Sequence, residues 1–325
     1  LLTEKKIHSY NLDIKKVLKI VLPLALGSFL VWYSLSDISL EILGNYFKEA
    51  NYSFIFLGLF FGILSHLSRA YRWKFMLEPL GFKPKFINSI LAVLVGYLVN
   101  LAIPRAGEIS RATVMTNYEK IPFEKAFGTI VAERIADLIM MLSIVAITLF
   151  VQFDFIYDLL TKNFNPLKIS IGFALLIVGF YIFTSFVKKA TSGFLLKIKT
   201  FISGLIEGVT SIFKMKNKWA FIFHTLFIWA MYVAMFWATI PAIEGLNVPF
   251  GGILIGFIAG GFSIAATNGG IGLYPIAVAS ALALFDIPAE TATAFGWIMW
   301  TAQTAMIVIF GGLAFLLLPI YNKNT

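Results

Sequence analysis

The chain has 325 residues, of which 59% are hydrophobic, 16% are aromatic and only 13% are charged. Several apolar runs reach about 20 residues, the length that a helix needs to cross roughly 30 Å of hydrocarbon. These runs are continuous rather than alternating, and each segment in hydrocarbon must satisfy its own backbone hydrogen bonds. We therefore expect an all-α polytopic membrane protein in which residues 1–325 form a single membrane domain.

The formal net charge of +9 arises from 26 Lys and Arg against 17 Asp and Glu. Most of the excess lies beside the ends of apolar runs, as the positive-inside rule requires, so nucleic acid is not an expected partner. The chain has no cysteine, and its three histidines lack metal-ligand spacing, so we expect no metal and no cofactor. It contains no phosphate-binding loop, HExxH or GxSxG motif, and we do not expect an enzyme.

Six full spans are predicted from the apolar runs. They cover residues 17–35, 52–76, 124–151, 168–187, 219–240 and 290–318. The first run follows several lysines and ends in small residues, which also resembles a signal peptide, but we interpret it as a span.

Cations in the connections predict the orientation. The N-terminal segment, residues 69–85 and residues 188–218 together carry sixteen Lys and Arg, whereas the connections on the other side carry three. The positive-inside rule then places the sixteen, and both termini, on the cytoplasmic side of a bacterial inner membrane. Two further apolar stretches, 86–122 and 251–286, must enter and leave on one side, so each is predicted to be a broken hairpin.

The two hairpins are expected to enter from opposite faces, which indicates an inverted repeat or at least paired re-entrant segments. Glycine and proline clusters predict their breaks, since such breaks are tolerated in a membrane when protein or a wet cavity covers them. The break residues are Pro104 and Gly107 in the first hairpin and Gly269, Gly270, Gly272 and Pro275 in the second. For residues 260–266 we favour close helix packing by small residues over a break.

Residues 191–216 carry apolar positions at intervals of three and four, with lysines at the edges. This pattern predicts an amphipathic helix on the cytoplasmic leaflet, where it attracts anionic lipid or simply connects two spans.

Arg105, Glu108 and Arg111 follow the first break at i, i+3 and i+6. If a half-helix begins near Gly107, its unpaired N–H groups and its positive dipole end lie beside Arg105 and predict an anion site. Arginine suits phosphate because its planar fork donates two parallel hydrogen bonds and its charge persists on burial.

Glu133, Arg134 and Asp137 lie in an otherwise apolar span, where each charge costs a few kcal/mol. One interpretation is a structural network in which Arg134 ties Glu108 or Asp137. The functional interpretation is that the acids neutralise one arginine while another faces a wet cavity and receives an anionic headgroup. Both interpretations are compatible with each other.

The sequence resembles the flippase-like membrane domain of lysylphosphatidylglycerol synthases, which is also found as stand-alone proteins. The resemblance rests on four motifs: Arg69-Ala-Tyr-Arg72-Trp73, Asn100 followed by Pro104-Arg105-Ala-Gly107-Glu108 and Arg111, Glu133-Arg134 followed by Asp137, and Gly269-Gly270 followed by Gly272. It implies a lipid-translocating domain. These 325 residues contain no aminoacyl-transferase domain, so the synthase reaction is not expected of them.

The leading hypothesis is therefore a flippase or scramblase for a phosphate-bearing lipid, either a phospholipid, an aminoacyl-phospholipid or a polyprenyl-phosphate carrier. Membrane lipids are the expected partners, and self-association stays open. The candidate headgroup ligands are Arg105, Arg134, Arg111, Asn100 and Asn268, with Glu108, Glu133 and Asp137 as counter-charges. Two rivals remain: a membrane-embedded headgroup or sugar transferase with Glu108 or Asp137 as base, and an ion-coupled transporter of a small anion with Glu133 as coupling residue.

Overall fold

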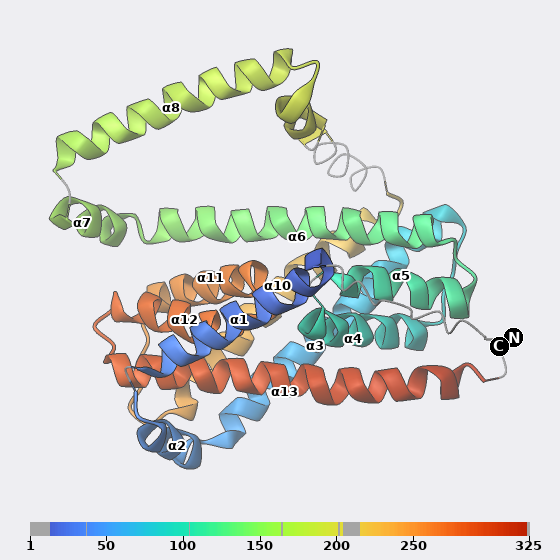
Figure 1. The fold of residues 1–325 in the computed structure, drawn as a ribbon, viewed down its shortest axis with the longest axis horizontal. Helices are drawn as coiled ribbons and strands as arrows, with labels where there is room; N and C mark the ends of the chain where they lie inside the picture. Colours follow the sequence, from blue (N-terminus) through green and yellow to red (C-terminus); the bar gives the residue numbers. More distant parts are fainter. Residues whose placement is uncertain are drawn as a thin grey trace, which may run out of the picture.

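The computed structural model describes residues 14–36, 38–103, 105–163, 165–200, 202–203 and 215–323, and this part of the chain consists of helices and short connections (Figure 1). The α-helices are α1 Ile14–Ser36, α2 Leu40–Glu49, α3 Tyr52–Leu77, α4 Phe86–Ala102, α5 Ala106–Glu119, α6 Phe123–Val151, α7 Phe153–Asn163, α8 Pro166–Lys189, α10 Lys218–Thr239, α11 Phe250–Ala266, α12 Leu273–Ala283 and α13 Ala289–Tyr321. Short 3₁₀ turns, η1 Glu78–Leu80 and η2 Ile240–Ala242, extend α3 and α10.

The predicted all-α polytopic class is confirmed. Among the described residues, five helical segments are long and apolar enough to cross a membrane, and they contain α3, α6, most of α8, α10 and α13. The predicted first span lies within α1, which turns by 84° into the shorter α2; counting this bent pair as one span gives six. The short helices α2 and α7 were not predicted from the sequence.

The stretch predicted as the first hairpin contains α4 and α5, which pack antiparallel. Asn88 near the start of α4 donates a hydrogen bond to Glu119 at the end of α5. Near the tip, Gly96 lies against Gly107, and the amide N–H of Gly107 donates to Asn100 Oδ1 at 2.7 Å. At 1.5 Å per residue, α4 spans only about 26 Å and α5 about 21 Å, so each is shorter than a full span.

The second stretch contains α11 and α12, joined by a turn of glycines. Gly269, Gly270 and Gly272 have φ angles of +63°, +80° and +69°, a left-handed conformation that favours glycine. The Gly269 carbonyl accepts a 2.9 Å bond from Trp300 Nε1 on α13, so protein satisfies a backbone group that the break exposes. These three glycines therefore form the break, as predicted.

Two other predicted break residues lie inside helices. Gly107 is in the first turn of α5, where the absence of a side chain lets α4 approach. Pro275 is in the first turn of α12, where a missing backbone N–H costs little because the first N–H groups of a helix have no intrahelical partner. Pro104 lies outside the described residues. Residues 260–266 continue α11, and Gly260 packs on the Tyr274 ring, as the small-residue interpretation predicted.

The order of elements repeats, since α3, α4–α5 and α6 match α10, α11–α12 and α13. The two leading helices are antiparallel: Gly58 early in α3 lies against Thr239 at the end of α10, and Arg72 late in α3 bonds to Thr225 early in α10. Figure 1 shows the two hairpins toward opposite ends of the long helices, with their tips toward the middle. This is the arrangement of an inverted repeat.

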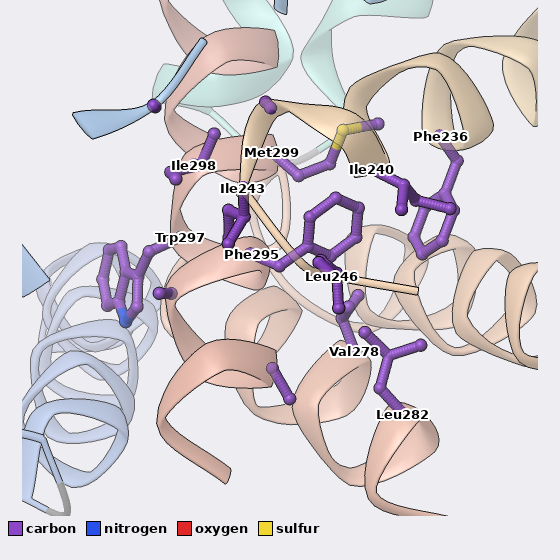
Figure 2. Packing of buried hydrophobic residues seen from close by; sticks show 14 of the residues in the cluster. Phe236, Ile240, Ile243, Leu246, Val278, Leu282, Phe295, Trp297, Ile298 and Met299 are labelled. Carbon is purple, nitrogen blue, oxygen red and sulfur yellow. The ribbon is translucent and has the colours of Figure 1, made fainter. Parts of the chain in front are cut away.

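Each closing helix packs on the hairpin of the other unit. Gly261 of α11 faces Met141 of α6, and Gly311 of α13 faces Leu98 of α4. The second hairpin is also anchored by apolar packing between α10, α12 and α13, where the Phe236 and Phe295 rings meet edge to face at 5.2 Å (Figure 2). The hairpins are thereby held against rigid helices at their sides, while their tips meet in the middle.

In Figure 1, α8 lies apart from the other long helices, and most of its apolar side chains are exposed, as expected for a surface that faces lipid. Of the predicted amphipathic helix over 191–216, residues 193–200 and 202–203 are helical. Residues 204–214 lie outside the described part of the chain.

We expect Gly107→Ala to destabilise the protein by about 1–3 kcal/mol, because the new methyl group would overlap the Gly96 carbonyl oxygen and the Asn100 side chain. Gly128→Ala is the matched control, since Gly128 lies in α6 with no atom within 4 Å of an added Cβ. The control should be neutral or slightly stabilising. Thermal unfolding of both purified variants in detergent tests this, and equal melting temperatures would contradict the close packing of the hairpin.

Candidate functional site

A buried ion network joins α3, α5 and α6. The Arg69 Nη1 atom of α3 lies 2.6 Å from both Glu133 Oε1 and Asp137 Oδ2 of α6. Glu133 is fully buried and also receives two 3.1 Å hydrogen bonds from the Arg111 guanidinium of α5. Two parallel bonds of this kind are the strong form of an arginine–carboxylate pair.

Arg72 completes the network one turn after Arg69. Its Nη2 atom lies 3.1 Å from Asp137 Oδ1 and 3.5 Å from Glu133 Oε1, and its Nη1 atom donates to the Thr225 hydroxyl of α10. The Arg111 guanidinium lies 4.4 Å from the Trp73 ring centroid. Ion pairs, hydrogen bonds and ring faces together satisfy charges that would otherwise be costly to bury.

The positions of Arg69 and Arg72 correct the sequence analysis, which counted both as cytoplasmic loop cations. Both lie within α3 and are buried, with 2% and 0% of their surface exposed. Without them the cytoplasmic count falls from sixteen to fourteen, against three on the other side, so the predicted orientation is unchanged. A usable signal existed, since all five arginines of the chain lie in three short motifs while its 21 lysines lie elsewhere.

Arg134 lies at the edge of this network. Its Nε atom is 3.2 Å from Glu108 Oε1, and its Nη1 atom is 3.5 Å from Asp137 Oδ2. Its side chain is 40% exposed, unlike the buried Arg69, Arg72 and Arg111. The structural interpretation of Arg134, as a link between Glu108 and Asp137, is therefore correct, and the same side chain is still accessible.

A cavity of about 1260 Å³ lies between the tips of the two hairpins. The tips meet where a Cβ on Gly269 would lie 2.5 Å from Leu101 Cδ2. The polar wall of the cavity comes from α3, α4, α5, α6, α10 and the turn between α11 and α12, and its apolar wall comes from α1, α6, α11 and α13. The polar lining includes His66, Arg69, Asn100, Arg105, Glu108, Arg134, Asp137, Trp229 and Asn268, and the apolar lining includes Leu26, Trp32, Met141, Phe257, Phe262 and Met306.

Most of the predicted ligands line this cavity: Asn100 of α4, Arg105 at the start of α5 and Arg134 of α6 come from the first repeat, and Asn268 comes from the turn between α11 and α12 of the second. Arg105 is exposed and has a left-handed φ of +60° at the start of α5. Within the described chain it forms no ion pair. Of the predicted counter-charges, Glu108 and Asp137 also line the cavity.

Arg111 and Glu133 do not line this cavity, so Arg111 is corrected as a headgroup ligand, whereas Glu133 pairs with arginines as the predicted counter-charge. Both terminal nitrogens of Arg111 are bonded to Glu133, and both residues are at least 97% buried. We therefore assign both to the structural network. This burial also argues against Glu133 as a coupling residue, because it faces guanidinium groups rather than the cavity.

The start of α5 offers fewer free N–H groups than the sequence predicted. The first two N–H groups of α5 already have partners, since Ala106 N–H donates to the Ile103 carbonyl and Gly107 N–H to the Asn100 side chain. An anion at this site would therefore bind mainly to guanidinium groups. Asn100 acts as the residue that fixes the start of α5.

The arrangement has a surplus of positive charge. Five arginines gather here against the three carboxylates Glu108, Glu133 and Asp137, and two of those arginines, Arg105 and Arg134, are accessible from the cavity. The rest of the lining is mainly apolar. A cavity with one cationic end and apolar walls is suited to an amphiphile that carries an anionic group.

We expect Glu133→Gln to destabilise the protein by about 3–5 kcal/mol, because the change keeps the side-chain shape but leaves buried guanidinium groups without their carboxylate. Glu108→Gln is the matched control, since its pair with Arg134 is partly exposed and should contribute only about 0–1 kcal/mol. Folded yield and thermal unfolding would separate the two variants. Equal behaviour would mean that the network does not hold the fold.

Partial similarity links the chain to two archaeal proteins. A UPF0104 membrane protein of Methanocaldococcus jannaschii is 30% identical over 125 residues, which are 38% of this chain and 37% of that protein. A UPF0104 membrane protein of Pyrococcus horikoshii is 25% identical over 168 residues, which are 50% of this chain and 47% of that protein. The matched regions thus span less than half the length of either relative. No solved structure matches the chain significantly.

A family model covers far more of the chain than either relative does. The model described as the lysylphosphatidylglycerol synthase TM region matches residues 20–311. This range includes both repeats apart from the last ten residues of α13, and it includes all five arginines of the ion network and cavity. The chain therefore belongs to the family of the lysylphosphatidylglycerol synthase TM region.

Proposed function

We propose that this protein moves a phosphate-bearing lipid between the two leaflets of a membrane, as a flippase or scramblase. The observation that carries the proposal is the large cavity between the hairpin tips, which combines accessible arginines with apolar walls. Membership of the family is compatible with this role. The proposal involves no covalent chemistry on the lipid, and the partners it requires are membrane lipids.

The cationic end supports recognition of phosphate. Arg105 is exposed and unpaired within the described chain, while Arg134 shares its charge between Glu108 and Asp137. None of the lysines in the described part of the chain lines the cavity, although lysines are four times as numerous. Guanidinium groups bind carboxylates and phosphates through two parallel hydrogen bonds, whereas a lysine acts as a point charge. A cavity whose cations are all arginines therefore favours an oxyanion such as phosphate.

The apolar walls support a ligand with hydrocarbon chains. Trp32 of α1 and Phe262 of α11 both line the cavity and are more than half exposed, and Leu26 is 50% exposed. Apolar surface that is accessible at the edge of a membrane cavity lets chains stay in hydrocarbon while the headgroup enters. A carrier of a small hydrophilic anion would not need these walls.

The proposed orientation follows from the lysines. Both termini lie on the cytoplasmic side of the cytoplasmic membrane, where fourteen cations of the connections also lie. The two hairpins then enter from opposite sides and meet at the cavity. A lipid at that position has one hairpin toward each leaflet.

The test is transbilayer movement of fluorescent phospholipids and of a polyprenyl phosphate in proteoliposomes. Arg105→Ala should lower the rate at least tenfold, because it removes the accessible unpaired cation. Lys120→Ala is the matched control: Lys120 is an exposed cation at the other end of α5 with a similar left-handed φ of +58°, and it does not line the cavity. It should leave movement unchanged.

Equal loss in both variants would mean that backbone strain or folding of α5, rather than the Arg105 charge, controls movement. No movement of any lipid, with or without a pH gradient or potential, would contradict the proposal. The transferase and small-anion hypotheses would then be tested by product formation and by uptake of labelled phosphate.

A further inference from the structure

His66 is a buried polar side chain that the arginine network does not use. It lies one turn before Arg69 on α3, only 8% of its surface is exposed, and it lines the cavity. No group of the described chain forms a hydrogen bond with either of its ring nitrogens. His224, by comparison, accepts or donates a 2.8 Å bond with the Ser68 hydroxyl.

Trp229 of α10 presents a second polar atom of this kind. Its indole Nε1 is buried without a hydrogen-bond partner in the described chain, and the residue lines the same cavity. By contrast, Trp73, Trp297 and Trp300 each donate their indole N–H within the protein. Two rings in one cavity wall thus carry polar atoms that the protein leaves without a partner.

Tyr232 holds these two rings in place. Its ring lies 6.2 Å from the His66 ring and 6.1 Å from the Trp229 ring, both in edge-to-face contact. His66 also lies 4.5 Å from the Tyr97 ring, and the Tyr97 and Tyr232 hydroxyls are 3.2 Å apart. These ring contacts place both side chains in the same part of the cavity wall.

A buried donor without a hydrogen-bond partner lowers the stability of a protein by about 1–3 kcal/mol. Two such groups in one cavity wall therefore require an explanation. An indole is only a donor, and a neutral imidazole offers one donor and one acceptor. Neither ring supplies the permanent charge that phosphate prefers. The chemistry that fits is an uncharged oxygen that accepts a hydrogen bond.

We propose that His66 and Trp229 form an uncharged donor subsite for a neutral oxygen of the lipid, either an ester carbonyl or a headgroup hydroxyl. The phosphate binds separately at Arg105 and Arg134. This inference rests on the proposed function in taking the ligand to be a lipid. It adds that the cavity distinguishes between lipids of equal charge.

The test measures this discrimination directly, by competitive binding to the detergent-solubilised full chain followed with native mass spectrometry. One equimolar pair is diester phosphatidylglycerol with its diether analogue, which has the same headgroup and chains without ester carbonyls. The other pair is phosphatidylglycerol with phosphatidylpropanol, which has the same charge without headgroup hydroxyls. We expect a preference of about fivefold for the oxygen-bearing lipid in one of the pairs, which corresponds to one net hydrogen bond.

His66→Phe and Trp229→Phe keep aromatic rings but remove the donors, and each should bring that preference close to one. His66→Gln retains a donor and should restore part of it. The matched controls are His224→Phe and Trp237→Phe, which change the same residue types outside the cavity lining. Arg105→Ala should weaken binding of both lipids of a pair without changing their ratio.

The outcomes separate the two proposals. Loss of preference in the diester pair identifies the ester carbonyl, and loss in the headgroup pair identifies the hydroxyl. Intact lipid binding with ratios near one in the unchanged protein, or with ratios unaffected in His66→Phe and Trp229→Phe, overturns the subsite alone. Absence of binding by every lipid overturns the subsite together with the proposed function.

Discussion

The pairing of one buried carboxylate with three guanidinium groups is the constraint on which the first repeat depends. Glu133 lies 2.6 Å from Arg69, 3.5 Å from Arg72 and 3.1 Å from Arg111, and these arginines come from two other helices. A single charge at this depth would be costly, and three would be worse, so each group requires the others. The network therefore fixes α5 against α3 and α6. Because Arg105 directly precedes α5 and Arg111 lies within it, fixing α5 through Arg111 also positions the cavity residue at its N-terminus.

The second repeat reaches a similar shape by different means. Its hairpin has no ion network in the described structure and is instead held by glycine contacts and aromatic packing, as in the approach of Gly256 to Phe236 and of Gly260 to Tyr274. Its break is satisfied by backbone and indole groups, whereas the first break lies beside charged side chains. An inverted repeat with such unequal halves gives the cavity one cationic wall and one apolar wall. This asymmetry suits an amphiphile, because its anionic headgroup binds to cationic side chains and its hydrocarbon chains pack against apolar ones.

Hydropathy and charge predicted the long helices and the two hairpins well, because hydrocarbon permits few other solutions for runs of that length. The same reasoning failed for Arg69 and Arg72, since cations at the end of an apolar run are typical of a cytoplasmic flank. Their burial depends on carboxylates more than sixty positions later in the chain, and no local pattern contains that information. Arg111 was misassigned for a related reason: its spacing from Arg105 is helical, but only the packing of α5 decides which of the two faces the protein and which the cavity.

The five arginines differ in how far they are buried and how many carboxylates they contact. Arg72 and Arg111 are buried and paired with carboxylates and ring faces, and Arg69 reaches the cavity while held by Glu133 and Asp137. Arg134 is shared between two carboxylates and partly exposed, and Arg105 is exposed without a carboxylate partner among the described residues. Guanidinium groups suit every step of this series, because they keep their charge when buried and bind two oxygens at once. A lysine could serve at the exposed end but not within the network, where one carboxylate must be contacted from several helices. Arginine thus forms both the buried ion network and the binding surface of the cavity. The positive charge available to a ligand at Arg105 and Arg134 is the charge of the five arginines that the three carboxylates do not neutralise.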